Sequence, residues 1–534
     1  MALPRMMRSI VVLVIASLIA LSCGADPAVR APDDAPEGTA APVQGDDGGD
    51  SQAGAETQTD DATTQDQSPT TATTDEAATP DESVAPDASD PIIALAGAPG
   101  GESVGDSYYP GIGNTGYDVS HYDLTLTVEV PGDDQLTATA VIDITTAEAL
   151  SRLSFDLEPS LIASAVTIDD VEATFEQGDS KLRITPGANL EAGEHVVVID
   201  YAGRPGTVDS LTRIGNIGWF DRPDVSVSVG EPFGARTWYP VNDHPIDKAT
   251  YTFNLDVDQD LRGVANGVLT SDEQVDGRRL STWEMRQPMA SYLATIAVGD
   301  FTLVQSEPGA GVEVFDAVPT RLRDVFVGDF ELTDEMLETF VDLFGPYPFD
   351  EYGVLIADTE LGFALETQGR SLFSSAFVDG DGSIERIVAH ELAHQWFGNN
   401  VSPARWQDIW LNEGFASYAE DLWIEFGRDG DVDALEDRLV SRAQSALLPA
   451  PGDPGAAGLF DPSVYRRGGL TLHSLRLTVG DDVFFDILKE WNIRYGGGSA
   501  STADFVALSE ELSGAELSSF FDAWLGDGAL PPLR

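Results

Sequence analysis

The sequence predicts a multidomain α+β protein in which a β-rich region precedes a mostly helical one. From about residue 108 to 301 apolar and polar residues alternate, as in residues 122–130 (YDLTLTVEV), and this two-residue period is typical of strands with one buried face. After about residue 318 the period becomes helical, and residues 337–344 (LETFVDLF) place apolar side chains at i, i+3, i+4 and i+7. Residues 24–104 show neither period.

Composition excludes several classes of protein. The 534 residues contain 29 Lys and Arg against 91 Asp and Glu, which gives a net charge of −62. A chain this acidic is not expected to bind nucleic acid through a basic surface. Its single cysteine excludes a disulfide framework within the chain and a multi-cysteine metal cluster, whereas 42% hydrophobic residues are enough for large buried cores.

The first segment, residues 1–23, has the pattern of a secretory signal. Two arginines precede an apolar run over residues 10–20, which is too short to span a membrane. Cys23 follows at the expected cleavage position, and this arrangement resembles a bacterial lipoprotein signal, in which the cysteine carries lipid. Ala20 stands where such signals usually have leucine. We therefore expect an exported cell-envelope lipoprotein anchored at Cys23, with ordinary secretion as the alternative.

The second segment, residues 24–104, has the composition of a disordered acidic linker. Residues 24–100 contain 17 acidic residues, one basic residue and no aromatic ones. The negative charges repel one another, and the segment has too few large apolar side chains to form a hydrophobic core. We expect it to hold the folded regions away from the anchor. Residues 101–534 contain 74 acidic and 26 basic residues. Because anionic lipid headgroups repel so acidic a surface, we expect membrane contact only through the N-terminal lipid.

Two folded segments follow, a β-rich one over residues 105–305 and a mostly helical one over residues 306–534. The expected helix that ends at residue 344 has Thr333 as its N-cap. Asp379, Asp381 and Ser383 are expected to form a turn and an N-cap rather than a calcium loop, because the twelfth position is not glutamate. Further helices are expected over residues 384–396, 406–426, 469–479, 483–493 and 503–525.

Residues 390–394 (HELAH) form the first candidate site. A helix places residues four apart on one face, so His390 and His394 reach the same ion, while Glu391 lies beside them within reach of a water. A second expected helix carries Glu413, nineteen residues beyond His394. Two imidazoles and one carboxylate leave a fourth position open, as in catalytic zinc sites. A buried helix with unrelated histidines is the alternative, since the five-residue pattern also occurs by chance.

The residues around this site carry a family resemblance. Residues 390–399 read HELAHQWFGN and residues 406–416 read WQDIWLNEGFA. The chain thereby resembles the gluzincin metallopeptidases, and within them the M1 aminopeptidases of the aminopeptidase N type. The resemblance implies one Zn²⁺ per chain, with Glu391 as the general base and with three ligands, His390, His394 and Glu413. Co²⁺ and Mn²⁺ are expected as substitutes in vitro.

The resemblance also implies a fold and an oxyanion donor. The fold is an N-terminal β-saddle domain followed by a thermolysin-like catalytic domain. Residues 465–469 (YRRGG) stand where the family has Tyr-x-Lys-Gly-Ala, so Tyr465 is the expected hydrogen-bond donor to the oxyanion, with a packed surface tyrosine as the alternative. Because only about 70 residues follow Tyr465, we expect a short form with an open cleft.

Two acidic residues are expected to bind the free amine of a substrate. Residues 363–367 (FALET) replace the family's Gly-Ala-Met-Glu-Asn element, which implies four substrate-binding residues, Phe363, Ala364, Leu365 and Glu366. Glu231 stands five residues before Arg236, where the family has a second amine-binding residue. Together Glu231 and Glu366 would form an anionic pocket for an ammonium group. Otherwise Glu231 is one more surface acid.

These observations predict a zinc aminopeptidase that removes N-terminal residues from peptides outside the cytoplasm. The departures from the family pattern at Phe363 and Thr367 leave a relaxed zinc endopeptidase as an alternative. A non-catalytic peptide-binding lipoprotein is the third possibility, and the intact Glu391, Glu413 and Tyr465 argue against it.

Overall fold

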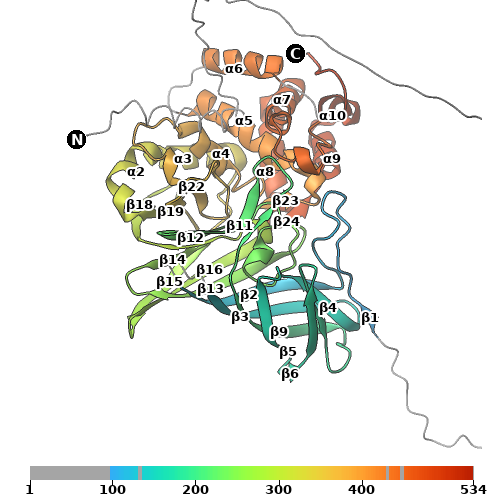
Figure 1. Cartoon of the computed structure of the whole chain (residues 1–534). Helices are drawn as coiled ribbons and strands as arrows, with labels where there is room; N and C mark the ends of the chain where they lie inside the picture. The colour runs from blue at the N-terminus through green and yellow to red at the C-terminus, as the bar shows by residue number, and fades with distance from the viewer. Residues whose placement is uncertain (1–96, 130–134, 428–431, 446–449, 533–534) are drawn as a thin grey trace, which may run out of the picture. The chain divides into compact units, whose positions relative to one another are not determined.

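The computed structural model describes residues 97–129, 135–427, 432–445 and 450–532. The expected signal, lipidation at Cys23 and nearly all of the expected linker lie outside these residues. In the described part of the chain, no helix has both the length and the apolar character needed to cross a membrane. The predicted α+β architecture is confirmed, since strands dominate up to about residue 319 and helices dominate beyond it (Figure 1).

The largest sheet of the N-terminal region has eight strands in the order β15-β16-β13-β2-β3-β9-β5-β6. Its strands are β2 (Tyr117–Val128), β3 (Leu136–Thr146), β5 (Leu161–Ile168), β6 (Val171–Glu172), β9 (Gly193–Gly203), β13 (Lys248–Asp258), β15 (Val268–Val275) and β16 (Arg278–Ala290). The alternation predicted for β2 is confirmed, because Tyr122, Leu124 and Leu126 are buried. β13 runs parallel to β2, so the sheet joins stretches of chain more than a hundred residues apart.

Two smaller sheets complete this region. One has the order β1-β4-β8-β7 and consists of β1 (Ala98–Pro99), β4 (Leu150–Asp156), β8 (Lys181–Thr185) and β7 (Thr174–Gly178). The other has the order β10-β11-β12-β17-β14 and consists of β10 (Thr207–Asp209), β11 (Asn216–Arg222), β12 (Val225–Val229), β17 (Ile296–Gly299) and β14 (Arg262–Ala265). Glu231 lies two residues beyond the end of β12, before the short helix η1 (Ala235–Thr237).

A further sheet begins the helical region. It consists of β18 (Phe301–Gly309), β19 (Val312–Pro319), β20 (Glu351–Tyr352), β21 (Val354–Ala357) and β22 (Ser371–Ser374). The division expected between residues 305 and 306 falls inside β18. The reason is that β18 pairs with β19, and β19 pairs in turn with β21 rather than with a strand of the N-terminal region.

The helices of the described residues lie mainly after this sheet. They are α2 (Arg323–Phe330), α3 (Thr333–Phe344), α4 (Glu385–Ala393), α5 (Trp410–Phe426), α6 (Val432–Ser445), α7 (Pro462–Val479), α8 (Asp481–Tyr495), α9 (Thr502–Ser513) and α10 (Ser518–Leu525). The prediction of one helix over residues 503–525 is wrong, because Gly514, with φ of +67°, ends α9 in the left-handed conformation. Neither α2 nor α6 is among the helices expected from the sequence.

Both predicted N-caps are wrong, although both helices exist. Thr333 is the first residue of α3, and its hydroxyl donates to the Phe330 carbonyl at 2.9 Å. α4 begins at Glu385 and is preceded by Ile384, so Ser383 stays in the turn. The carboxylate of Asp329 accepts three backbone N–H groups of this turn, and it thereby holds the turn that precedes α4.

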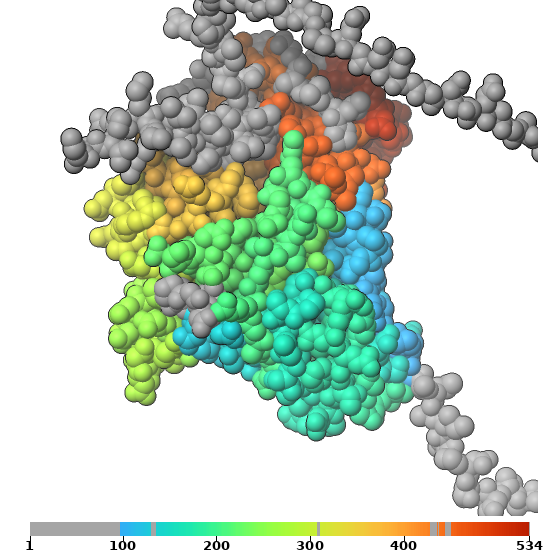
Figure 2. Space-filling model, in the orientation of Figure 1, coloured from blue at the N-terminus to red at the C-terminus, as the bar shows by residue number. Residues whose placement is uncertain are grey.

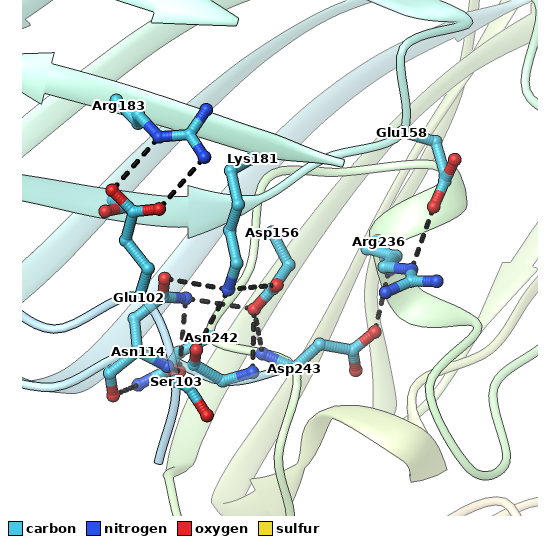
Figure 3. A network of polar contacts seen from close by, with 12 residues as sticks. Glu102, Ser103, Asn114, Asp156, Glu158, Lys181, Arg183, Arg236, Asn242 and Asp243 are labelled. Atoms are coloured by element: carbon cyan, nitrogen blue, oxygen red, sulfur yellow. Dashed lines mark hydrogen bonds and ion pairs between the residues drawn. The ribbon is translucent and has the colours of Figure 1, made fainter. Parts of the chain in front are cut away.

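A buried polar network surrounds Lys181 of β8 (Figure 3). Its Nζ lies 2.6 Å from Asp156 Oδ1 and donates to Asn114 Oδ1 at 3.1 Å, while Asp156 Oδ2 accepts from the Asp243 N–H at 3.2 Å. The side chains of Lys181 and Asp156 are 6% and 0% exposed, so each buried charge is stabilised by the opposite charge of its partner. The network joins β4 and β8 to the loop after η1.

The segment around residues 100–116 contacts both the strands and the helices, and it is blue in Figure 2. The carboxylate of Asp106 accepts a hydrogen bond from the Trp406 N–H at 3.1 Å and lies 3.3 Å from His244 Nε2. The ring of Tyr109 packs 4.8 Å from that of Phe233. This segment therefore connects the helical region to the loop that follows η1.

Candidate functional site

Two adjacent helices bring the predicted metal ligands together. His390 lies near the end of α4, and His394 is the residue that follows the helix. Glu413 lies in the first turn of α5, which packs beside α4. All three residues are buried, and one donor atom from each lies within 4.8 Å of the others. The pattern of two histidines four residues apart and a distant glutamate thus produces a convergent set of donors.

The hydrogen bonds of the histidines prepare them to bind a metal. His390 Nδ1 lies 3.0 Å from Glu420 Oε1, and His394 Nδ1 lies 3.0 Å from the Phe397 carbonyl oxygen. Because both partners accept only, each Nδ1 carries a proton, and each Nε2 is the nitrogen left to bind a metal. The two Nε2 atoms face Glu413 Oε2, at 3.3 Å from His390 and 3.6 Å from His394.

This donor set fits zinc. Ligands about 2.0–2.2 Å from a tetrahedral ion lie about 3.4 Å from one another. This value is close to the 3.3 and 3.6 Å between Glu413 Oε2 and the two imidazole nitrogens. Two imidazoles and one carboxylate are also the ligand types of catalytic zinc sites, and three ligands leave one coordination position for water or substrate. The histidines hold the pKa of Glu413 at about 2 against the opposing effect of burial, so this ligand is ionised.

Glu391 lies beside the donors rather than among them. One of its carboxylate oxygens lies within 4.8 Å of donor atoms from His394 and Glu366. Burial, with the neighbouring Glu366 and Glu413, raises its pKa to about 8 despite the two histidines. A carboxyl group whose pKa lies near neutral pH can both accept a proton and give it back. A general base that later acts as an acid must do both.

Glu231 and Glu366 form a second acidic group next to the metal ligands. A carboxylate oxygen of each lies within 4.8 Å of the other and of Glu413, and Glu366 Oε1 lies 3.9 Å from His394 Nδ1. Glu231 Oε1 and Glu366 Oε1 are buried, and neither has a hydrogen-bond partner among the described residues. Burial and mutual repulsion raise the pKa of Glu231 well above its usual range. A ligand cation would satisfy both oxygens.

The segment over residues 363–367 runs beside the edge of β22. Leu365 exchanges backbone hydrogen bonds with Leu372 at 2.9 and 2.7 Å, an antiparallel pairing that leaves Glu366 next to His394. Asn399 Nδ2 donates to the Glu366 carbonyl at 2.5 Å, which holds this backbone against the chain after α4. Leu365 is buried, and Phe363 and Ala364 are half-buried against the core.

Tyr465 lies over the metal ligands. It sits in the first turn of α7, and its ring stacks against that of His390, with centroids 5.9 Å apart and 21° between the planes. The tyrosine is 8% exposed, so most of its side chain is buried beside His390. A phenol in this position supplies a neutral hydrogen-bond donor to charge that develops next to the metal.

A close helix crossing sets the position of Tyr465. α5 and α7 pack together where Gly414, the residue after Glu413, meets Gly468. A Cβ atom added to Gly468 would lie 2.8 Å from the Gly414 Cα atom, and one added to Gly414 would lie 2.9 Å from the Gly468 Cα atom. No side chain fits between the two backbones, so the helices approach as closely as packing allows. The crossing therefore places Tyr465 near the ligand that precedes Gly414.

Comparison with known proteins agrees with this geometry. The profile of the Peptidase M1 N-terminal domain matches residues 119–293, and that of the Peptidase family M1 domain matches residues 329–524. A mutant M1 zinc metallopeptidase from Deinococcus radiodurans, solved with a Tyr-Ser-Ala substrate, is 34% identical with a TM-score of 0.72, and the match covers 81% of this chain and 99% of that one. The chain belongs to peptidase family M1.

Two curated aminopeptidases share less sequence identity with the chain. Leucyl aminopeptidase of Saccharolobus solfataricus is 24% identical over 387 residues, which are 69% of this chain and 48% of that protein. Aminopeptidase N of Lactococcus lactis is 25% identical over 416 residues, which are 72% of this chain and 48% of that protein. The chain thus spans about half the length of these curated relatives.

Sequence reasoning missed several residues that shape this M1 site. Glu420, which contacts His390, lies seven residues after Glu413 and so on the same face of α5, and this spacing was a readable signal. Asn399, which holds the Glu366 carbonyl, was part of the quoted HELAHQWFGN stretch. Tyr292 donates to the Gly398 carbonyl at 2.9 Å from the N-terminal region, and no local pattern points to it.

Proposed function

We propose that the protein is a zinc aminopeptidase that removes N-terminal residues from peptides. The observation that carries the proposal is the pair of buried carboxylates, Glu231 and Glu366, next to the donor cluster. An ammonium group would compensate both charges, and this requirement selects substrates with a free amine. An endopeptidase has no use for such a pocket at this place.

His390, His394 and Glu413 would hold the zinc ion. When bound, zinc supplies a Lewis acid that polarises the scissile carbonyl and lowers the pKa of water. Because the amine pocket lies within a few ångströms of these ligands, a peptide held there by its ammonium group presents its first carbonyl at the metal centre. The pocket thereby sets both the orientation of the peptide and the bond that is cleaved.

Glu391 and Tyr465 carry the proton transfer and the charge stabilisation. Glu391 takes a proton from the attacking water and then delivers it to the departing amine, which leaves as a neutral group. The Tyr465 hydroxyl donates a hydrogen bond to the oxygen of the scissile carbonyl as that oxygen becomes negative. Both groups are held by buried helices, so little reorganisation accompanies the reaction.

The test compares free and N-acetylated aminoacyl p-nitroanilides with the full-length zinc-loaded protein. We expect hydrolysis of the free-amine substrates only, and its loss with a zinc chelator. Glu366→Gln should lower kcat/KM by about 100-fold or more, because a buried ammonium loses its charged partner. Glu360→Gln, at an exposed glutamate six residues upstream, is the matched control and should have no effect.

Each contrary outcome identifies an alternative. Equal rates on free and acetylated substrates would reject the aminopeptidase and favour a relaxed zinc endopeptidase, for which the departures at Phe363 and Thr367 are the supporting observation. Tight zinc binding without turnover of either substrate would instead indicate a peptide-binding protein.

We further propose that the enzyme works outside the cytoplasm as a cell-envelope lipoprotein. The arginines and apolar run before Cys23 support export, and the acidic, aromatic-free composition of residues 24–104 supports a tether between the anchor and the folded domains. Cys23→Ala should move the protein from the membrane fraction to the soluble fraction of expressing cells. An unchanged distribution would rule out lipidation at Cys23.

A further inference from the structure

Two adjacent carboxylates stand behind the metal centre on α5. Glu420 and Asp421 are 1% and 0% exposed in their side chains, and they follow each other in the sequence. Two neighbouring negative charges buried in this way repel each other and lose their hydration, so they require positive partners at close range. His390 Nδ1 contacts one oxygen of this pair, Glu420 Oε1, at 3.0 Å.

The positive partners come from α6. Arg438 donates from Nη2 to Glu420 Oε2, and its Nε lies 2.5 Å from Asp421 Oδ1, so one guanidinium bridges both carboxylates. Arg442 donates to Asp421 Oδ2, and its Nη2 lies 3.6 Å from Glu420 Oε2. The two arginines are four residues apart and therefore lie on one face of the helix. That face is turned toward α5.

The contacts form a chain that leads to a metal ligand. Arg438 holds one oxygen of Glu420, and the other oxygen accepts the hydrogen of His390 Nδ1 at 3.0 Å. The guanidinium therefore fixes the carboxylate against which the imidazole ring is oriented, and the orientation of the ring decides where Nε2 points. Arg442 fixes the same turn of α5 through two hydrogen bonds of 3.1 Å to the Ser417 carbonyl.

We propose that Arg438, assisted by Arg442, is a positioning residue of the metal centre that acts on His390 through Glu420. This inference rests on the proposed zinc site, but it does not depend on which substrate is cleaved. It gives α6 a role in metal binding, although neither arginine touches the ion. In other proteins, removing a partner that orients a metal ligand lowers the metal affinity about 10–100-fold.

The test measures zinc affinity of the full-length protein by competition with a chromophoric chelator. Arg438→Gln should raise the dissociation constant for zinc about 10–100-fold. Arg438→Lys should recover part of the affinity, because a lysine supplies the charge but cannot bridge two carboxylates in a fork. The control is Arg494→Gln, which removes an arginine from an exposed ion pair with Glu490 and Glu511 and should leave zinc affinity unchanged.

A double-mutant cycle separates positioning from a general structural effect. Glu420→Gln removes the relay, so Arg438→Gln added to it should weaken zinc binding by less than about threefold more. The inference is overturned if Arg438→Gln lowers the melting temperature of the metal-free protein but leaves zinc affinity unchanged. It is also overturned if the loss caused by Arg438→Gln is undiminished in the Glu420→Gln background.

These outcomes are distinct from a failure of the proposed function. Wild-type protein that binds zinc tightly but hydrolyses no aminoacyl amide would reject the aminopeptidase, while the affinity cycle would still test Arg438. Conversely, if the wild-type enzyme is active and Arg438→Gln leaves the zinc affinity unchanged, the positioning role alone is rejected.

Discussion

Glu391→Gln is expected to lower kcat for hydrolysis of an aminoacyl p-nitroanilide by about 10²–10⁴-fold while the protein still binds one zinc ion. Glutamine preserves the size and the hydrogen-bonding capacity of the side chain but cannot accept a proton. Glu391 is not among the three converging ligand atoms, so metal content should be retained. Steady-state kinetics and zinc analysis on the same preparation measure both quantities.

The control for this prediction is Glu338→Gln, which makes the same chemical change at an exposed position of α3. It should match the wild type in kcat and in zinc content. If Glu391→Gln retained more than a tenth of the wild-type kcat, another group would have to take the proton, and the assigned role of Glu391 would be wrong.

Tyr465→Phe is expected to lower kcat by about 10²–10³-fold with little change in KM. Phenylalanine keeps the ring that stacks on His390 but loses the hydroxyl, so only the hydrogen bond to the developing oxyanion is removed. The substrate's ground state gains little from that hydrogen bond, which is why the effect should fall on kcat. The measurement is the separate determination of kcat and KM.

Zinc affinity distinguishes this role from simple packing. Tyr465→Phe should leave the dissociation constant for zinc unchanged, as should the control Tyr495→Phe at a half-buried tyrosine of α8. A normal kcat in Tyr465→Phe would mean that the residue is a packed tyrosine beside the site and that the oxyanion is stabilised by another donor.

The ligand cluster was predictable because its information is local. The spacing of His390 and His394 fixes their common direction within one helix, and Glu413 follows at a readable distance. The position of Glu231 depends instead on the packing of the N-terminal region against the helical one. The sequence could suggest this residue only by family resemblance, since no periodicity within β12 points toward α4.

The differences between the expected and the observed elements have a common physical origin. The hairpin of β18 and β19 has strand character, but its partner β21 is chosen by tertiary packing, so the local pattern could not assign these strands to the helical region. Among the side chains of α6 that the structure describes, the buried apolar ones are Leu435 and Leu439, and the many polar residues around them gave a weak signal. Its arginines pair with charges on α5, and such ion pairs are not part of the apolar periodicity from which a helix is predicted.

The contact between Gly414 and Gly468 has a consequence for redesign of the enzyme. Because the two backbones touch directly, the separation of α5 and α7 is determined by main-chain atoms and not by any pair of interlocking side chains. Residues on the remaining faces of α7 can therefore be varied without changing that separation. A library that alters substrate preference would keep both glycines, Glu413 and Tyr465 invariant and randomise other positions. Randomising either glycine would change the substrate preference and the catalytic geometry together.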